Sequence, residues 1–249
     1  MEQNPLNELE ALQEQASHEL EEGFTALAEV LTDFEIEQDS EPNTLLLKKG
    51  QKEKHANEIA QELIGFKHML ENGAKCFDEI LKRFAKERPE KDVKNVSVDL
   101  AKLGFYFITF EEHAEEFDMA MEEDKTIQEL VGIRPATLKL LYEAAALLYE
   151  EARFSDAASC FAILTFLNPH EPLFWLGLGN AEYYCQHYEK ALMTYAFVVQ
   201  VNPDDPTPHL FSSKCYEELQ DIDNAINALD LALYVIRDEE NQEQLKKQI

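Results

Sequence analysis

Apolar residues recur every three to four positions along most of this 249-residue chain, which is the period of an amphipathic α-helix. Three such stripes fill the first 124 residues, and polar stretches that carry Pro42 and Pro89 separate them. Proline disfavours helix in the residue before it, so each stretch marks a boundary. The pattern predicts an N-terminal helical region over residues 1–124, with helices at about 5–32, 51–88 and 97–123.

From about residue 138 the pattern repeats at a fixed interval. A small residue, a larger apolar residue four positions later and a proline all recur at the same spacing: Ala157, Ala191 and Ala225; Phe161, Tyr195 and Leu229; Pro169 and Pro203. The spacing matches that of tetratricopeptide (TPR) repeats, which have a period of about 34 residues and consist of a helix A, a turn and a helix B. We therefore expect a TPR domain over residues 125–237.

The interval also sets the expected fold class and the boundaries of the repeats. The chain is predicted to be all-α, with three tandem TPR repeats that form a concave solenoid, preceded by the α-helical N-terminal region. The repeats are expected at about residues 138–171, 172–205 and 206–237. Residues 238–249 are expected to form a polar C-terminal tail or helix.

The stretch PLFWLGLGNAEYY, residues 172–184, allows two interpretations because it holds two glycines one residue apart. A phosphate-binding G-x-G-x-x-G loop would need a third glycine where Glu182 stands. In the TPR frame, Trp175, Leu178 and Gly179 instead occupy the W-x₂-L-G positions of helix A. The stretch is therefore predicted to be a helix whose Gly179 lets helix B pack closely.

Composition narrows the function further. Fifty acidic residues against 22 basic ones give a formal net charge of −28, which disfavours binding to nucleic acid and anionic membranes. The start of the chain does not resemble a signal peptide, and no apolar run is long enough for membrane insertion. The four cysteines form no CxxC pair, and no residues match a catalytic motif. We expect a cytoplasmic binding protein without metal, cofactor or enzymatic activity.

The concave side of a TPR array is lined by its A helices, so the binding face can be read from the repeat frame. Its predicted residues are mainly aromatic and aliphatic, and such side chains suit recognition of an apolar ligand. The groove residues predicted in this way are Tyr142 and Tyr149 in repeat one, Leu173, Leu176, Asn180, Tyr183 and Tyr184 in repeat two, and Leu210 and Lys214 in repeat three. Asn180 and Lys214 are expected to hold the backbone of an extended peptide. An alternative is that some of the aromatic side chains pack against the N-terminal region or a capping helix.

Several segments resemble the class II type III secretion chaperones of the LcrH/SycD family. They are TIQELVGI, LYEAAALLYE, FWLGLGNAEYYCQHYEKALMTY and NPDDPTPHLFSSKCYEEL, within residues 125–235. The resemblance implies a cytoplasmic bacterial chaperone that holds a hydrophobic translocator protein before its secretion. It also implies that Leu167 and Tyr195 belong to the groove, beside Tyr142 and Tyr149. Members of the family commonly form homodimers through N-terminal helices.

A second interpretation is a TPR scaffold or a needle-subunit co-chaperone whose groove holds an amphipathic helix. In that case the N-terminal region would act as a built-in partner or as a dimerisation module. The resemblance does not account for the first 120 residues, so their role stays open at this point.

Overall fold

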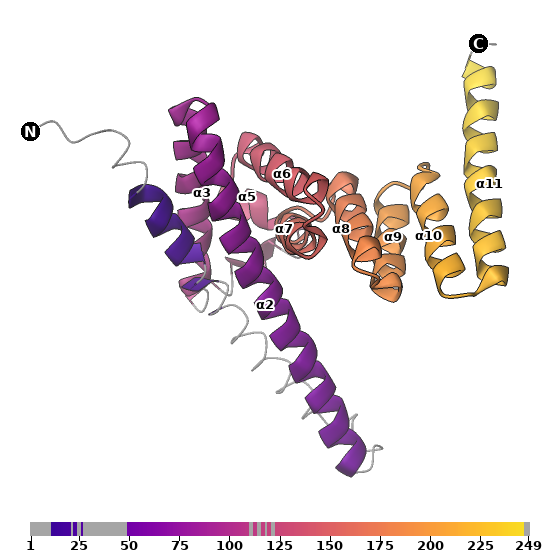
Figure 1. Ribbon diagram of the computed structural model, residues 1–249, viewed down its shortest axis with the longest axis horizontal. Coiled ribbons are helices and arrows are strands. Elements are labelled where there is room, and N and C mark those ends of the chain that lie inside the picture. The colour runs from indigo at the N-terminus through magenta and orange to yellow at the C-terminus, as the bar shows by residue number, and fades with distance from the viewer. Residues whose placement is uncertain are drawn as a thin grey trace, which may run out of the picture. The chain divides into compact units, whose positions relative to one another are not determined.

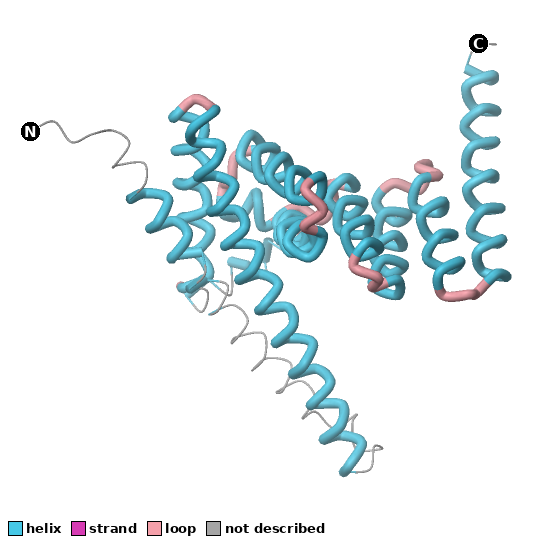
Figure 2. The backbone as a smooth tube through the Cα atoms, in the orientation of Figure 1, coloured by secondary structure: helices cyan, strands magenta, loops and turns pink. Residues whose placement is uncertain are grey.

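The computed structural model describes residues 11–20, 22–23, 26, 49–109, 112–113, 116–117, 119–120 and 123–246 (Figure 1). These residues form helices joined by loops, with no strand among them, so the predicted all-α fold is confirmed (Figure 2). Beyond a helix at residues 11–20, the helices are α2 Lys49–Glu87, α3 Glu90–Ile108, α5 Ile127–Val131, α6 Pro135–Glu150, α7 Phe154–Leu167, α8 Pro172–Tyr184, α9 Tyr188–Val201, α10 Thr207–Glu218 and α11 Ile222–Lys246.

Contacts divide the chain into two units, residues 1–144 and 145–249, and the division falls within α6. In the first unit, the helix at residues 11–20, α2 and α3 share a core. Its large, fully buried side chains are Leu20, Leu70, Phe77, Ile80, Leu103 and Phe107. The other predicted parts of the first helix, before residue 11 and after residue 26, lie outside the described residues.

The third helix begins earlier than its apolar stripe suggested. Pro89 directly precedes its first residue, Glu90, and the first turn also carries Asp92. Acidic side chains near a helix N-terminus stabilise it through the helix dipole, and a proline is tolerated there. The polar stretch expected to separate two helices is therefore only a short break, and α3 starts at residue 90 rather than near residue 97.

Two glycines bring the N-terminal helix very close to α3. A Cβ atom added to Gly23 would lie 2.4 Å from the carbonyl oxygen of Gly104, and one added to Gly104 would lie 2.2 Å from the backbone of Glu19. No side chain fits between backbones at these distances. Small residues at both positions are therefore what allows the two helices to cross here.

We expect Gly104→Ala to weaken the packing of the N-terminal helix on α3. The predicted cost is about 1–3 kcal/mol in the free energy of unfolding, because the helices must separate to admit the methyl group. Urea denaturation followed by circular dichroism measures it. Gly65→Ala is the matched control: Gly65 lies in α2 with nothing within 4 Å of an added Cβ, so alanine there should stabilise slightly. Equal effects of the two substitutions would contradict the crossing.

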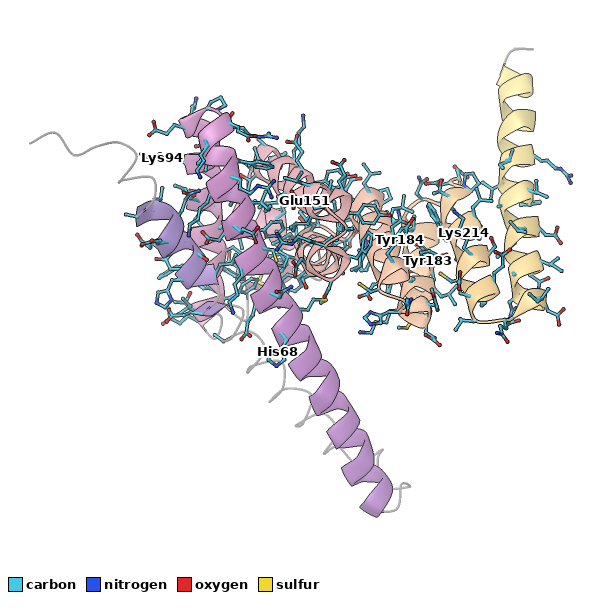
Figure 3. The ribbon with its side chains drawn as sticks, in the orientation of Figure 1. His68, Lys94, Glu151, Tyr183, Tyr184 and Lys214 are labelled. Atoms are coloured by element: carbon cyan, nitrogen blue, oxygen red, sulfur yellow. The ribbon has the colours of Figure 1, made fainter. Side chains whose placement is uncertain are left out.

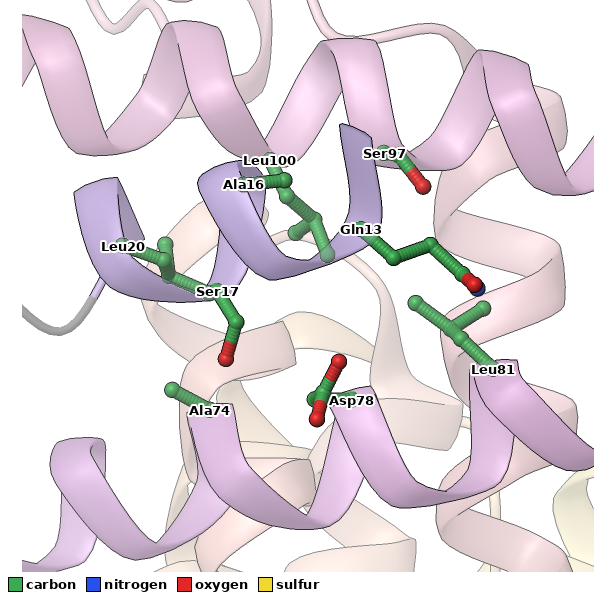
Figure 4. A pocket seen from close by; sticks show the side chains of 9 residues that line it. All are labelled: Gln13, Ala16, Ser17, Leu20, Ala74, Asp78, Leu81, Ser97 and Leu100. Carbon is green, nitrogen blue, oxygen red and sulfur yellow. The ribbon is translucent and has the colours of Figure 1, made fainter. Parts of the chain in front are cut away.

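A small cavity lies between the helix at residues 11–20, α2 and α3 (Figure 4). It has a volume of about 10 Å³, close to the space that one water molecule needs. The lining residues are Gln13, Ala16, Ser17, Leu20, Ala74, Asp78, Leu81, Ser97 and Leu100. The side-chain nitrogen of Gln13 is buried there without a hydrogen-bond partner among the described residues. The cavity is too small for an organic ligand.

A buried carboxylate connects α3 to the start of α6. Asp99 is fully buried, and its Oδ2 accepts hydrogen bonds from the Nε of Arg134 at 2.8 Å, the backbone N–H of Arg134 at 3.2 Å and the hydroxyl of Thr137 at 2.5 Å. Arg134 also donates to the carbonyl oxygen of Asn95. These bonds satisfy a charge that would otherwise be costly to bury. They fix the segment from which α6 begins.

The second unit consists of antiparallel helices in the predicted repeat frame. In it, α8 packs on α7 and α9, and α10 packs on α9 and α11. The small residues of the repeat, Ala157, Ala191 and Ala225, are buried near the start of each helix B. Each is small because it lies where the two helices of a repeat approach closely. The last helix continues to Lys246, so the region expected to be a polar tail or helix is helical up to that residue and continues α11.

The turns inside the repeats share one backbone feature that residue types alone do not reveal. Ala152, Gln186 and Gln220 have φ angles of 60°, 64° and 61°, and they recur at the same interval as the buried alanines. A left-handed residue lets each helix A end and the chain reverse into helix B. The three turns therefore share one backbone conformation. This supports the repeat frame independently of the apolar pattern.

Candidate peptide-binding groove

The exposed face of α8 is the centre of the predicted groove. By helical periodicity, Leu173, Leu176, Asn180 and Tyr184 lie on one face of this helix, opposite the buried Leu178 and Gly179. Leu173 is 52% exposed and Tyr184 is 54% exposed, so this face presents large apolar side chains to solvent at both of its ends. From Leu173 to Tyr184 the face is about 16 Å long, or roughly five residues of an extended peptide.

An aromatic cluster lies at one end of this face, and we define it as Tyr149, Phe154, Tyr183, Tyr184 and Tyr188. The rings are in sequential contact: the centroid distances are 5.3 Å for Tyr149–Phe154, 4.6 Å for Phe154–Tyr184, 5.4 Å for Tyr183–Tyr184 and 5.6 Å for Tyr183–Tyr188. Figure 3 labels Tyr183 and Tyr184 on α8. The cluster joins the ends of helices from two successive repeats into one apolar surface.

The phenols of Tyr149 and Tyr183 are uncharged at physiological pH, because their pKa values are raised. Burial and the neighbouring Tyr184 raise the pKa of Tyr149 to about 12. Burial, followed by the negative charge of Glu218, raises the pKa of Tyr183. The surface therefore offers neutral rings with hydroxyl groups, which suits contact with apolar segments that carry backbone polar groups.

Two predicted groove residues are buried in the core instead. Leu167 and Tyr195 are both fully buried. The hydroxyl of Tyr195 donates to the Oδ1 of Asn180 at 2.9 Å, and its ring stacks on Phe211 at 5.7 Å. In this structure, neither side chain is exposed to a ligand, and Tyr195 instead packs beneath α8, against Gly179 and Asn180. The same hydrogen bond uses the carboxamide oxygen of Asn180, the residue that was expected to hold a peptide backbone.

The remaining predicted residues lie on other helices. Tyr142 is half-buried on α6 and belongs to the first unit, whereas the other predicted groove residues belong to the second. Leu210 on α10 is 39% exposed. Lys214, labelled on α10 in Figure 3, is exposed, and its Nζ lies 4.9 Å from the ring centroid of Phe211. That contact stabilises the ammonium group against the ring and leaves it at the surface.

Sequence reasoning missed Phe154, Tyr188 and Phe211 as neighbours of the groove. The first two are the opening residues of α7 and α9, and Ile222 opens α11 at the corresponding position of the next repeat. This repeated apolar position was a usable signal. It was overlooked because the residues read from the repeat frame were taken from A helices, and the family resemblance added only Leu167 and Tyr195 from B helices.

The two glycines of α8 are packing residues. A Cβ added to Gly177 would lie 2.4 Å from the ring of Phe161, and one added to Gly179 would lie 2.5 Å from the ring of Tyr195. Both rings belong to B helices. The predicted role of Gly179 in close packing is thus confirmed.

The nearest arrangement to a catalytic site is at the end of α8. The Nδ1 of His187 lies 2.6 Å from the Oε2 of Glu182, and Cys185 lies between them in sequence. Burial, followed by the charge of Glu182, raises the pKa of Cys185, so its sulfur stays a thiol. A nucleophilic cysteine needs the opposite shift. In the described part of the chain, no three His, Cys, Asp or Glu side chains are grouped to bind a metal, and no helix is both long and apolar enough to cross a bilayer.

Comparisons with known proteins give relatives for about half of the chain. No family model matches it. Low calcium response locus protein H of Yersinia pestis is 26% identical over 139 residues, which are 54% of this chain and 83% of the relative. The protein of the same name from Yersinia pseudotuberculosis matches equally well.

Two solved structures are also similar. SycD, the type III secretion translocator chaperone of Yersinia enterocolitica, is 25% identical, with a TM-score of 0.45, over 49% of this chain and 92% of that chain. PcrH in complex with the chaperone binding region of PopB is 26% identical, with a TM-score of 0.41, over 42% and 84%. The similarity to low calcium response locus protein H confirms the resemblance of this chain to the class II type III secretion chaperones of the LcrH/SycD family.

Proposed function

We propose that this protein is a bacterial type III secretion chaperone that binds an extended segment of a hydrophobic translocator protein along α8. The observation that carries the proposal is the exposed apolar face of that helix, which runs from Leu173 into the aromatic cluster. An apolar surface of this kind on a folded protein usually marks a binding site. The similarity to low calcium response locus protein H supports the choice of ligand class.

The proposed mechanism is noncovalent binding and involves no covalent step. A translocator must enter membranes, and its apolar segments aggregate in water unless they are covered. Leu173 and Tyr184 would contact alternate apolar side chains of the ligand, while hydroxyl groups of the cluster would bind its backbone. The net charge of −28 would keep the complex dispersed through mutual repulsion.

Binding of a labelled translocator peptide to the full chain tests the proposal. We expect Leu173→Asp to weaken binding at least 10-fold, because the substitution places a charge against an apolar ligand. Tyr184→Ala should weaken it by a similar factor, because aromatic side chains dominate such contacts. Fluorescence anisotropy measures both, with a peptide that carries a Pro-x-Leu-x-x-Pro segment, the type of ligand segment that the family resemblance implies.

The matched control is Met193→Asp. Met193 is 62% exposed on α9, outside the face and the cluster, so the same loss of an apolar side chain there should leave the affinity unchanged. Circular dichroism verifies that each variant keeps its helices. If Leu173→Asp binds as tightly as Met193→Asp, the ligand lies elsewhere.

A further inference from the structure

One end of the aromatic cluster lies beside a carboxylate. The rings of Tyr183 and Tyr188 are in contact, with centroids 5.6 Å apart, and both side chains are partly exposed. Burial, followed by the negative charge of Glu218, raises the pKa of both phenols, so this carboxylate lies near both rings. Glu218 is exposed and forms no ion pair among the described residues. The two rings and the carboxylate therefore form one surface that is both aromatic and negatively charged.

The position of Glu218 is unfavourable for the helix that carries it. The C-terminus of a helix has a partial negative charge, which a basic side chain in the last turn would offset. The last turn of α10 has no basic residue, and the helix ends on Glu217 and Glu218 instead. The neighbouring α8, which ends on Tyr184, has no basic residue in its last turn either. Both helix ends and both carboxylates therefore add negative potential beside the rings.

The one lysine of α10 does not neutralise this surface. Lys214, labelled in Figure 3, precedes Glu218 by four residues, a spacing at which lysine and glutamate side chains often pair on a helix. Its Nζ instead lies 4.9 Å from the ring centroid of Phe211, and it forms no ion pair among the described residues. The charge of Glu218 is therefore available to a cation from a ligand.

We propose that the surface formed by Tyr183, Tyr188 and Glu218 binds a basic side chain, lysine or arginine, of the translocator segment. The inference rests on the proposed function, because it concerns the same ligand on the face of α8. A cation is attracted to the face of a tyrosine ring, and a carboxylate beside the ring adds to that attraction. An apolar side chain would gain the ring contact alone, and it would shield Glu218 from water without pairing its charge. The ligand is therefore an apolar segment that carries a basic residue.

Fluorescence anisotropy with the full chain and a set of labelled peptides tests the proposal. Each peptide has the Pro-x-Leu-x-x-Pro segment and carries lysine, glutamine or glutamate at one of the x positions or beside either proline. At the position that reaches Glu218, we expect lysine to bind at least about 5-fold more tightly than glutamine, and glutamate to bind more weakly than both. Glu218→Gln should remove the preference for lysine, and Glu218→Lys should reverse it in favour of glutamate.

Asp230→Asn is the matched control. Asp230 is exposed on α11, away from the aromatic cluster, and its replacement removes the same amount of negative charge as Glu218→Gln. It should keep the preference for lysine, and circular dichroism verifies that each variant keeps its helices. If the peptides bind but lysine gives no gain at any position, the inference is overturned while the proposed function stands. The same holds if Asp230→Asn removes the gain as fully as Glu218→Gln does. If no peptide binds at all, the proposed function fails, and the inference fails with it.

Discussion

Replacing Asp99 with alanine is expected to lower the free energy of unfolding of the N-terminal unit by about 3 kcal/mol. The carboxylate is fully buried and accepts from both the side chain and the backbone of Arg134. It also accepts from Thr137, which is itself 1% exposed. Alanine would leave the buried hydroxyl of Thr137 without its acceptor, and it would remove the ion pair of Arg134, whose side chain is partly exposed. Urea denaturation followed by circular dichroism measures the loss.

Asp92→Ala is the control on the same helix. Asp92 is exposed in the first turn of α3, so its removal should cost no more than about 1 kcal/mol through the helix dipole. A loss as small as this for Asp99→Ala would mean that the hydrogen bonds of Asp99 contribute nothing net.

The same carboxylate makes the N-terminal unit sensitive to acid. Burial alone would raise the pKa of Asp99, but the hydrogen bonds from Arg134 and Thr137 outweigh it and hold the pKa below its ordinary value of 3.8. A lowered pKa in the folded state means that the contribution to stability is complete above about pH 5. It is lost as the pH falls through the lowered pKa. Asp99→Ala should flatten this part of the stability curve, and parallel curves for the two proteins would contradict the assignment.

Gly179→Ala is expected to destabilise the second unit by about 3 kcal/mol, the upper range for an added methyl group in a packed core. The new Cβ would lie 2.5 Å from the ring of Tyr195. That ring cannot move aside easily, because it is fully buried and its hydroxyl is bonded to Asn180. Thermal unfolding of the purified variant measures the effect, with Gly65→Ala as the exposed control.

A double substitution tests the cause of this loss. Repeat three has a leucine, Leu229, at the position that corresponds to Tyr195. Tyr195→Leu therefore introduces a side chain that this position accepts, and it removes the ring that the new methyl group would strike. Gly179→Ala should therefore cost much less in a Tyr195→Leu background than alone. Additive effects would show that the methyl group disturbs something other than Tyr195.

The repeat half of the fold could be predicted because its packing repeats in sequence. Ala157, Ala191 and Ala225 recur at a fixed interval, and each is buried where two helices meet. The start of α3 could not be predicted from apolar periodicity. Its first turn is made of exposed charged residues, and a helix dipole and a preceding proline define it instead.

The groove was harder to predict than the fold. Leu173 and Tyr184 are exposed where the helix A positions place them, but Leu167 and Tyr195 are buried. Those two came from the family resemblance, and a matching residue type does not specify whether its side chain faces solvent or the next helix. The burial of Asp99 could not be predicted from the sequence either, because its partner Arg134 is 35 residues away along the chain.

The placement of Trp175 has a practical consequence for experiments on this protein. It is the only tryptophan of the chain; its ring stacks on Phe197 at 4.7 Å, and its indole N–H donates to the carbonyl oxygen of Pro169 at 2.7 Å. Tryptophan emission therefore reports on the second unit, where Pro169, Trp175 and Phe197 all lie, while circular dichroism reports on all helices together. Recording both signals in one denaturation separates the unfolding of the two units without a label.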